Sequence, residues 1–279
     1  MLKAVLFGAG GGGARLYKEI SVKYEIIAFV DNDKSKWGDY LYGIPIYDPV
    51  KCIDGLEYDY IIITSAPGMD SIKIQCLRMG IGEEKILTSY IEMPLESRRI
   101  FLKNFAGLLE EFKEDGECAE AGVFEGDFAK WINYYFPNKR LHLFDTFNGF
   151  SAKDIEKEGD LSKAKEGDYS HTSVETVMEK MFYPQRCIVH KGYFPETAQD
   201  ITDNFCFVNL DLDLYEPTYN GLKYFSTRLT KNGIILIHDY FAENFKGPKK
   251  AVDRFVKEHN GKVKISPIGD GISIMLIKV

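Results

Sequence analysis

The chain has 279 residues, of which 45% are hydrophobic and 28% are charged, and its formal net charge is −7. This composition is typical of a soluble globular protein, and the length suits one large or two modest domains. The negative charge argues against nucleic acid as a partner, because binding a phosphate backbone requires clustered Lys and Arg. No apolar run approaches the roughly 20 residues that span a bilayer. The five cysteines fit neither a zinc spacing nor a disulfide framework, so we expect a cytoplasmic protein.

The first 94 residues predict a small Rossmann-like α/β domain. A strand over 2–7 leads through a glycine run to a helix over 14–22 and a strand over 25–30, and strands over 60–64 and 85–87 follow. Gly8, Gly10 and Gly13 match the G-x-G-x-x-G turn, and Asp31 ends the second strand, so a nucleotide could bind here. Alternatively, the glycines serve packing only. The domain lacks a complete second mononucleotide half, and we therefore expect a structural or regulatory role.

A helix is predicted between this domain and the rest of the chain. Pro94 marks a boundary, and residues 97–114 carry apolar side chains at helical spacing. We assign residues 95–116 as a linker helix. It covers the next domain or contacts another subunit of a homo-oligomer, and the sequence does not separate these two uses.

Residues 117–279 predict the larger domain. Strands alternate with helices, and the pair Asn232 and Gly233 is expected to stop a helix over 218–229. The last two strands flank Gly269, Asp270 and Gly271, which is a hairpin signal. This order gives a mixed seven-stranded sheet. The polar segment 151–170 is too long for an ordinary connection. Its charge could equally mean a solvated helix, but we favour a mobile lid, and its residues 168–171 are candidate acceptor contacts.

Acidic side chains follow two of the predicted strands. The stretch CFVNLDLDLYEPT ends a buried strand in Asp211 and Asp213, which point the same way because side chains alternate along a strand. A second apolar strand ends in His238 and Asp239. Ligands of open α/β sheets bind at the carboxyl ends of the strands. This set suits a hard divalent cation or general-base chemistry, although a strand-end Asp can simply cap the next helix.

The larger domain resembles a known family of enzymes. A strand followed by E-x-G-x-x-x-G, with an acid after the next strand, is the layout of class I S-adenosylmethionine-dependent methyltransferases. The strings EAGVFEGDFAKWIN, LHLFDTFNGF, HKGYFPETA, FVNLDLDLYEPT, GIILIHDY and GPKKAVDRF, in this order, resemble the macrocin O-methyltransferase family over residues 97–279. Members of that family are metal-dependent enzymes that methylate sugar hydroxyls of antibiotics and related glycosides. The fold expected is therefore a class I methyltransferase sheet joined to a smaller N-terminal Rossmann-like domain.

The resemblance also assigns roles to residues. Asp213 is similar to the general base of the family, with His238 as a second catalytic candidate, and Asp211, His238 and Asp239 fall at the metal ligands. The expected contacts to S-adenosylmethionine are Glu120, Ala121, Gly122, Gly126, Asp145, Thr146, Gly192, Tyr193 and Asp211.

His238 departs from the family pattern, which carries an Asp-Asp pair at this point. Mg²⁺ prefers oxygen ligands, and imidazole suits softer ions. Three alternatives follow. Asp211 and Asp239 hold Mg²⁺ with His238 outside the coordination shell, or the site takes Mn²⁺ or another softer ion, or no metal binds and His238 helps to deprotonate the acceptor.

We predict an O-methyltransferase whose acceptor is a sugar hydroxyl on a polysaccharide precursor, a nucleotide-linked sugar or a glycoside. The alternative from another class is a non-catalytic methyltransferase-like module in a sugar pathway. An NAD-dependent oxidoreductase is disfavoured, because nothing near Gly8, Gly10 and Gly13 supplies an acid or base for hydride transfer.

Overall fold

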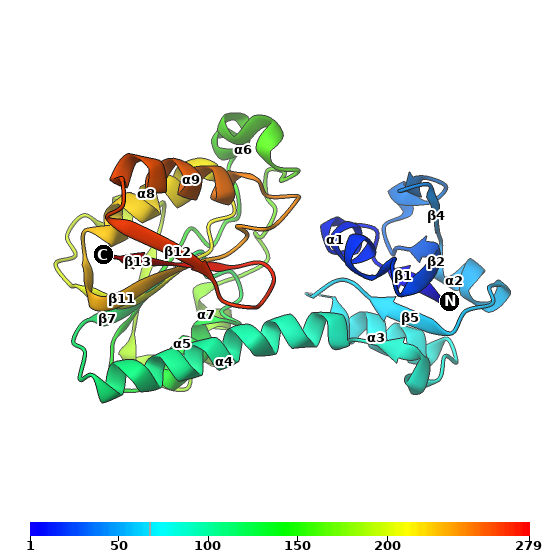
Figure 1. Cartoon of the computed structure of the whole chain (residues 1–279), viewed down its shortest axis with the longest axis horizontal. Helices are drawn as coiled ribbons and strands as arrows, with labels where there is room; N and C mark the ends of the chain where they lie inside the picture. The colour runs from blue at the N-terminus through cyan, green and yellow to red at the C-terminus, as the bar shows by residue number, and fades with distance from the viewer. Residues whose placement is uncertain (67) are drawn as a thin grey trace. The chain divides into compact units, whose positions relative to one another are not determined.

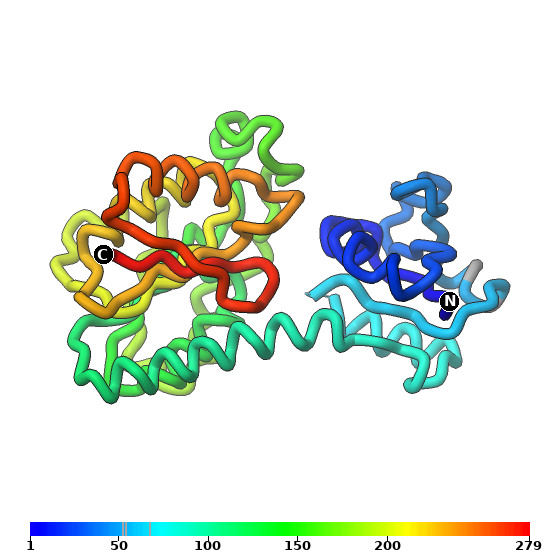
Figure 2. Tube along the Cα trace, in the orientation of Figure 1, coloured from blue at the N-terminus to red at the C-terminus, as the bar shows by residue number. Residues whose placement is uncertain are grey.

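A computed structural model describes residues 1–66 and 68–279, without the side chains of Cys52 and Asp54. The chain forms two compact units, Met1–Glu96 and Ser97–Val279, and Figure 2 traces both. Within the described residues, no helix combines the length and apolar character of a bilayer span. Four cysteines with described side chains are free thiols.

The N-terminal unit is built on a six-stranded sheet with the strand order β3-β4-β2-β1-β5-β6. All of its pairings are parallel except that of β3 with β4. The elements are β1 (Leu2–Phe7), α1 (Gly11–Ile20), β2 (Tyr24–Val30), β3 (Tyr40–Leu41), β4 (Ile44–Tyr47), α2 (Pro49–Cys52), β5 (Tyr60–Ile63), α3 (Met69–Arg78) and β6 (Ile86–Leu87).

The short hairpin of β3 and β4 was not predicted. Tyr42 and Gly43 join its strands, with φ of 55° and 79°. Two consecutive positive φ angles are typical of the tight turn that matches the twist of a hairpin. Gly43 was the available signal, but Tyr rarely occupies such a position, and the turn was therefore missed.

The helix predicted at the boundary starts earlier than expected. Helix α4 runs from Ser89 to Glu111, and Pro94 lies inside it. The prediction placed the start at residue 95, directly after Pro94, because Pro cannot donate the helical hydrogen bond. The loss of that single bond near the N-terminus of a 23-residue helix is tolerated here. Leu102, Ala106 and Leu109 of α4 are buried in the core of the C-terminal unit.

The C-terminal unit contains the predicted mixed seven-stranded sheet, in the order β12-β13-β11-β10-β7-β8-β9. Strand β13 is antiparallel to both of its neighbours, and the other pairings are parallel. The elements after α4 are β7 (Glu117–Ala121), α5 (Ala129–Tyr135), β8 (Leu141–Asp145), α6 (Ala152–Glu158), α7 (Val174–Lys180), β9 (Cys187–Lys191), β10 (Phe205–Leu210), α8 (Tyr215–Ser226), β11 (Leu229–Ile237), α9 (Gly247–His259), β12 (Val263–Pro267) and β13 (Ile274–Lys278).

Helices cover both faces of this sheet. Figure 1 shows α8 and α9 on one face and α4, α5 and α7 on the other. Two separate hydrophobic clusters lie between the sheet and these two helix layers. All six residues of β10 are buried, which places this strand at the centre of the unit, where its carboxyl end is firmly held.

One predicted feature differs in the structure, and another stays a prediction. Asn232 and Gly233 were expected to stop a helix, but they lie inside β11, where the register with β10 shifts. An Asn-Gly pair also suits a β-bulge, because Gly tolerates the irregular backbone. Segment 151–170, interpreted as a lid, contains α6 and a short 3₁₀ helix, Gly159–Leu161, and Ser162 bridges to Phe245.

Candidate active site

The predicted site lies where two central strands end side by side. Leu210 of β10 pairs with Ile237 of β11, and the next residues along the two strands are Asp211 and His238. The His238 N–H donates to the Leu210 carbonyl at 3.0 Å, and the Asp211 N–H donates to the Ala121 carbonyl at 2.8 Å. The strand ends are therefore fixed by backbone hydrogen bonds, and the sheet itself brings these side chains together.

Three of the predicted side chains form a compact cluster. His238 Nδ1 lies 3.2 Å from Asp211 Oδ1 and 3.3 Å from Asp239 Oδ1. One ligand atom from each of the three residues lies within 4.8 Å of the others. His238 Nδ1 is buried, yet it makes no well-aligned hydrogen bond. These carboxylate and imidazole atoms could hold a divalent cation, and with a proton on Nδ1 they form two ion pairs instead.

Two of the carboxylates stand on unusual backbone. Asp213 and Asp239 have φ of 58° and 57°, the left-handed region that costs a non-glycine residue about 1 kcal/mol or more. Such conformations persist only where the surrounding structure enforces them, and they cluster at functional sites. This strain disfavours the reading in which these Asp residues merely cap helices.

The charges of the cluster are strongly coupled. Burial raises the pKa of Asp213, and the neighbouring charges of Asp239 and Asp211 raise it further. Burial also acts to raise the pKa of Asp211, but the positive charges of His238 and Arg98 outweigh it and bring that pKa to about 2. Burial lowers the pKa of His238, whereas the charge of Asp211 raises it to about 9. A proton on His238 thus balances the crowded carboxylates, and a bound cation would do the same.

A buried polar network that sequence reasoning missed supports the cluster. Arg98 of α4 donates from Nη2 to Asn209 Oδ1 at 2.8 Å and lies 3.5 Å from Asp211 Oδ2. Asn209 in turn donates to Glu120 Oε1 at 2.7 Å. The only sequence signal was an Asn inside an otherwise apolar buried strand, since buried polar groups require partners. Glu120, expected to contact the methyl donor, lies in this network and is 2% exposed.

The glycine turn after β7 packs directly against this strand end. Gly122 has φ of +84°, and a Cβ at this position would lie 1.7 Å from the Asp211 carbonyl oxygen. Gly126 also has a positive φ, of +77°, and faces Val177. Packing therefore explains both glycines, whatever their role toward a ligand.

The other expected contacts of the methyl donor surround this turn. Asp145 accepts from the Val123 and Phe124 N–H groups at 2.7 and 2.9 Å and so ties the turn to β8. The Gly192 N–H donates to the Asp145 carbonyl. Thr146 Oγ1 donates to the Gly149 carbonyl at 3.3 Å, and the Tyr193 hydroxyl donates to Asp154 of α6 at 2.8 Å. Ala121 is buried at the end of β7.

In the N-terminal unit, the acid that follows the second strand is Asp31, and its carboxylate already accepts hydrogen bonds from within the unit. Asp31 accepts from the Ala9 and Asp33 N–H groups and from Lys36 Nζ. A Cβ on Gly13 would lie 2.0 Å from the Gly8 carbonyl oxygen. These contacts agree with the packing interpretation of the glycine run.

The residues of the cluster fit a divalent cation. Two carboxylates and an imidazole are a donor set that suits Mn²⁺ and related ions, whereas Mg²⁺ prefers oxygen alone. His238 Nδ1 is buried between Asp211 Oδ1 and Asp239 Oδ1, so loss of its proton would present a nitrogen ligand beside two carboxylate oxygens.

Comparison with known proteins identifies the family. The macrocin O-methyltransferase (TylF) family matches residues 98–274, well over half of the chain. This chain belongs to that family. It is an S-adenosylmethionine-dependent O-methyltransferase, as its sequence predicted. A second family, described as C2185-like N-terminal, matches residues 1–87.

Solved structures agree with the fold of this O-methyltransferase. The O-methyltransferase NovP is 16% identical, with a TM-score of 0.53, over 66% of this chain and 80% of NovP. The calicheamicin methyltransferase CalS11 is 17% identical, with a TM-score of 0.53, over 76% of this chain and 90% of CalS11. The apo form of CalS11, described as a TDP-rhamnose 3'-O-methyltransferase, has a TM-score of 0.47 at 17% identity and covers 75% of this chain and 86% of its own. No curated protein matches the chain.

Proposed function

We propose that this enzyme transfers a methyl group from S-adenosylmethionine to a sugar hydroxyl, and that a divalent cation assists at Asp211, His238 and Asp239. The observation that carries the proposal is the convergence of these three side chains beside Asp213 at the carboxyl edge of the sheet. Mn²⁺ is the favoured ion because one of the three ligands is nitrogen.

In the proposed mechanism, Asp213 accepts the proton of the acceptor hydroxyl. Its burial and the nearby carboxylates raise its pKa, which makes it a stronger base than an exposed Asp. The acceptor oxygen forms a bond to the methyl carbon as the carbon–sulfur bond breaks, and S-adenosylhomocysteine leaves. When bound, the cation supplies Lewis acidity that favours ionisation of a hydroxyl. Asp211 and Asp239 fix the position of this chemistry, since alignment accounts for much of the rate in such displacements.

The sugar acceptor rests on resemblance. The family is named for macrocin O-methylation, and CalS11 is described as a TDP-rhamnose 3'-O-methyltransferase. We therefore propose a nucleotide-linked sugar, a polysaccharide precursor or a glycoside as the acceptor. We further propose that the chain is organised as the N-terminal domain 1–94, the linker helix 95–116 and the catalytic domain 117–279, and that the first of these serves a structural or regulatory role in the cytoplasm.

Transfer of labelled methyl groups tests this function. The enzyme is incubated with [methyl-³H]S-adenosylmethionine and a panel of nucleotide sugars and glycosides, after EDTA treatment and after addition of Mg²⁺ or Mn²⁺. We expect label in at least one sugar, with activity lost in EDTA and restored best by Mn²⁺. Tight donor binding without transfer to any member of the panel would instead favour the non-catalytic module.

A further inference from the structure

Arg98 is a buried cation next to the proposed metal ligands. It is 7% exposed, and its guanidinium lies 4.0 Å from the ring centroid of Phe128. Its Nη2 atom lies 2.8 Å from Oδ1 of Asn209, which is in β10, and 3.5 Å from Oδ2 of Asp211, which directly follows β10. Asn209 and Asp211 are two positions apart, so both side chains project from the same face of the strand.

The geometry fixes the orientation of each partner. The Asn209 amide donates to Glu120 Oε1 and accepts from Arg98, so its oxygen must face Arg98. Asp211 has Oδ2 directed at Arg98 and Oδ1 directed at His238. The two carboxylate oxygens are thus divided, one toward the supporting network and one toward the cluster.

Burial of an arginine at this point is costly. Removing a guanidinium from water costs several kcal/mol, and apolar side chains of similar volume often serve stability equally well. The Arg98 Nε atom is buried without a hydrogen bond, as is Glu120 Oε2, so the network is not optimised for stability. A role in the site accounts better for an arginine here.

We propose that Arg98 is a positioning residue, which holds Asp211 so that Oδ1 is presented to the cation. The inference rests on the proposed cation site.

A competing role for the same residue is simple charge balance, in which Arg98 only offsets the surplus of carboxylates. The two roles predict opposite changes in cation affinity when Arg98 is replaced. If Arg98 acts through charge alone, its removal strengthens cation binding, because a like charge is taken away. If Arg98 positions Asp211, its removal weakens cation binding, as loss of an outer-shell partner does elsewhere by about 10- to 100-fold.

The test is a Mn²⁺ titration followed by the electron paramagnetic resonance signal of free Mn²⁺. Wild type is compared with Arg98→Met, Arg98→Lys and the control Lys103→Met, which removes a charge from an exposed position on the same helix. We expect Arg98→Met to bind Mn²⁺ at least about tenfold more weakly, with wild-type affinity for S-adenosylmethionine. Arg98→Lys should be weakened less, because an ammonium keeps the charge but not the rigid planar group that places Nη2 between Asn209 and Asp211. The control should match wild type.

Separate outcomes overturn the inference and the function on which it rests. Unchanged or tighter Mn²⁺ binding by Arg98→Met overturns the positioning role alone. If Arg98→Met does not fold, Arg98→Lys decides, and wild-type affinity in that variant overturns the role. Absence of Mn²⁺ binding by wild type overturns the cation site and the inference with it.

Discussion

The substitution Gly122→Ala should disrupt the site from its backbone side. A Cβ at position 122 would lie 1.7 Å from the Asp211 carbonyl oxygen. A separation of 3.0 Å is already a tight contact, so the β10 end must move by about 1.3 Å. This shift would strain the hydrogen bond from the Asp211 N–H to the Ala121 carbonyl, now 2.8 Å long, and displace the Asp211 side chain.

Gly167 provides a matched control for the backbone angle. Its φ of +81° is close to the +84° of Gly122, but a Cβ there would contact nothing within 4 Å. Gly167→Ala therefore incurs only the left-handed conformation, about 1–2 kcal/mol, partly offset by the lower entropy of the unfolded chain. Gly122→Ala adds the clash, and we expect about 3 kcal/mol or more of destabilisation.

Thermal unfolding and Mn²⁺ binding measure the two consequences. For a unit of this size, 1 kcal/mol corresponds to roughly 2–4 °C in Tm. Gly122→Ala should therefore lower Tm by about 6 °C or more, with loss of Mn²⁺ binding, while Gly167→Ala changes Tm by less than about 4 °C. Equal Tm values for the two variants would refute the steric argument.

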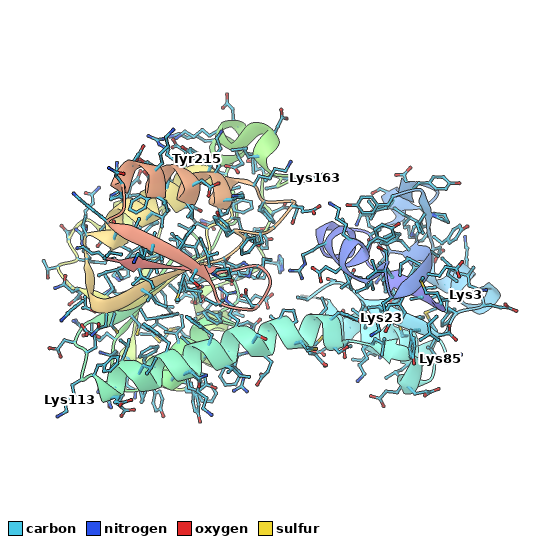
Figure 3. All side chains as sticks on the ribbon, in the orientation of Figure 1. Lys3, Lys23, Lys85, Lys113, Lys163 and Tyr215 are labelled. Carbon is cyan, nitrogen blue, oxygen red and sulfur yellow. The ribbon has the colours of Figure 1, made fainter. Side chains whose placement is uncertain are left out.

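Three further substitutions test other parts of the structure. Asp213→Asn should lower kcat by about 10²- to 10⁴-fold, as loss of a general base does, with donor affinity unchanged by calorimetry; a kcat near wild type would remove Asp213 from the mechanism. Glu158 accepts at 2.7 Å from the N–H of Tyr215, the residue that begins α8 and is labelled in Figure 3. Glu158→Ala should therefore lower the local free energy of unfolding by about 1–3 kcal/mol, and hydrogen exchange should accelerate over 152–161 and remain slow in α9. Burial and His190 lower the pKa of His142 from 6.5 to about 4. Between these two pH values, His142 therefore binds a proton in the unfolded chain but not in the folded one. The free energy of unfolding should then drop by up to about 3 kcal/mol between pH 7 and pH 4, and urea titrations of His142→Gln should show a smaller decline, whereas an identical decline would exclude His142 as its source.

The sequence indicated the cluster because one rule of sheet geometry determines it. Asp211, Asp213, His238 and Asp239 each follow an apolar strand, and strands of this type end at the same edge. The pairing of β10 with β11 then places Asp211 beside His238, as expected. The mixed seven-stranded sheet followed from the alternation of elements and the final hairpin, whereas its strand order comes from the structure alone.

The supporting network could not be predicted because it depends on how α4 packs. Arg98 lies 113 positions before Asp211. The helical period places it on the buried face of α4, four residues before Leu102, but does not show which residues of the sheet it meets. The same holds for Glu158, which composition assigned to a solvated segment although it is 5% exposed. Pro94 misled the prediction of the helix start, because the local cost of Pro is outweighed by the rest of a long helix.

The most direct test of the proposed cation site is a calorimetric titration of Mn²⁺ into the enzyme loaded with S-adenosylmethionine. Wild type is compared with Asp211→Asn, and donor binding is measured in both as a control for folding. We predict one cation per chain in wild type and none in Asp211→Asn, with donor binding retained in both proteins. Equal Mn²⁺ binding in both proteins would contradict the assignment of the cation to Asp211, His238 and Asp239.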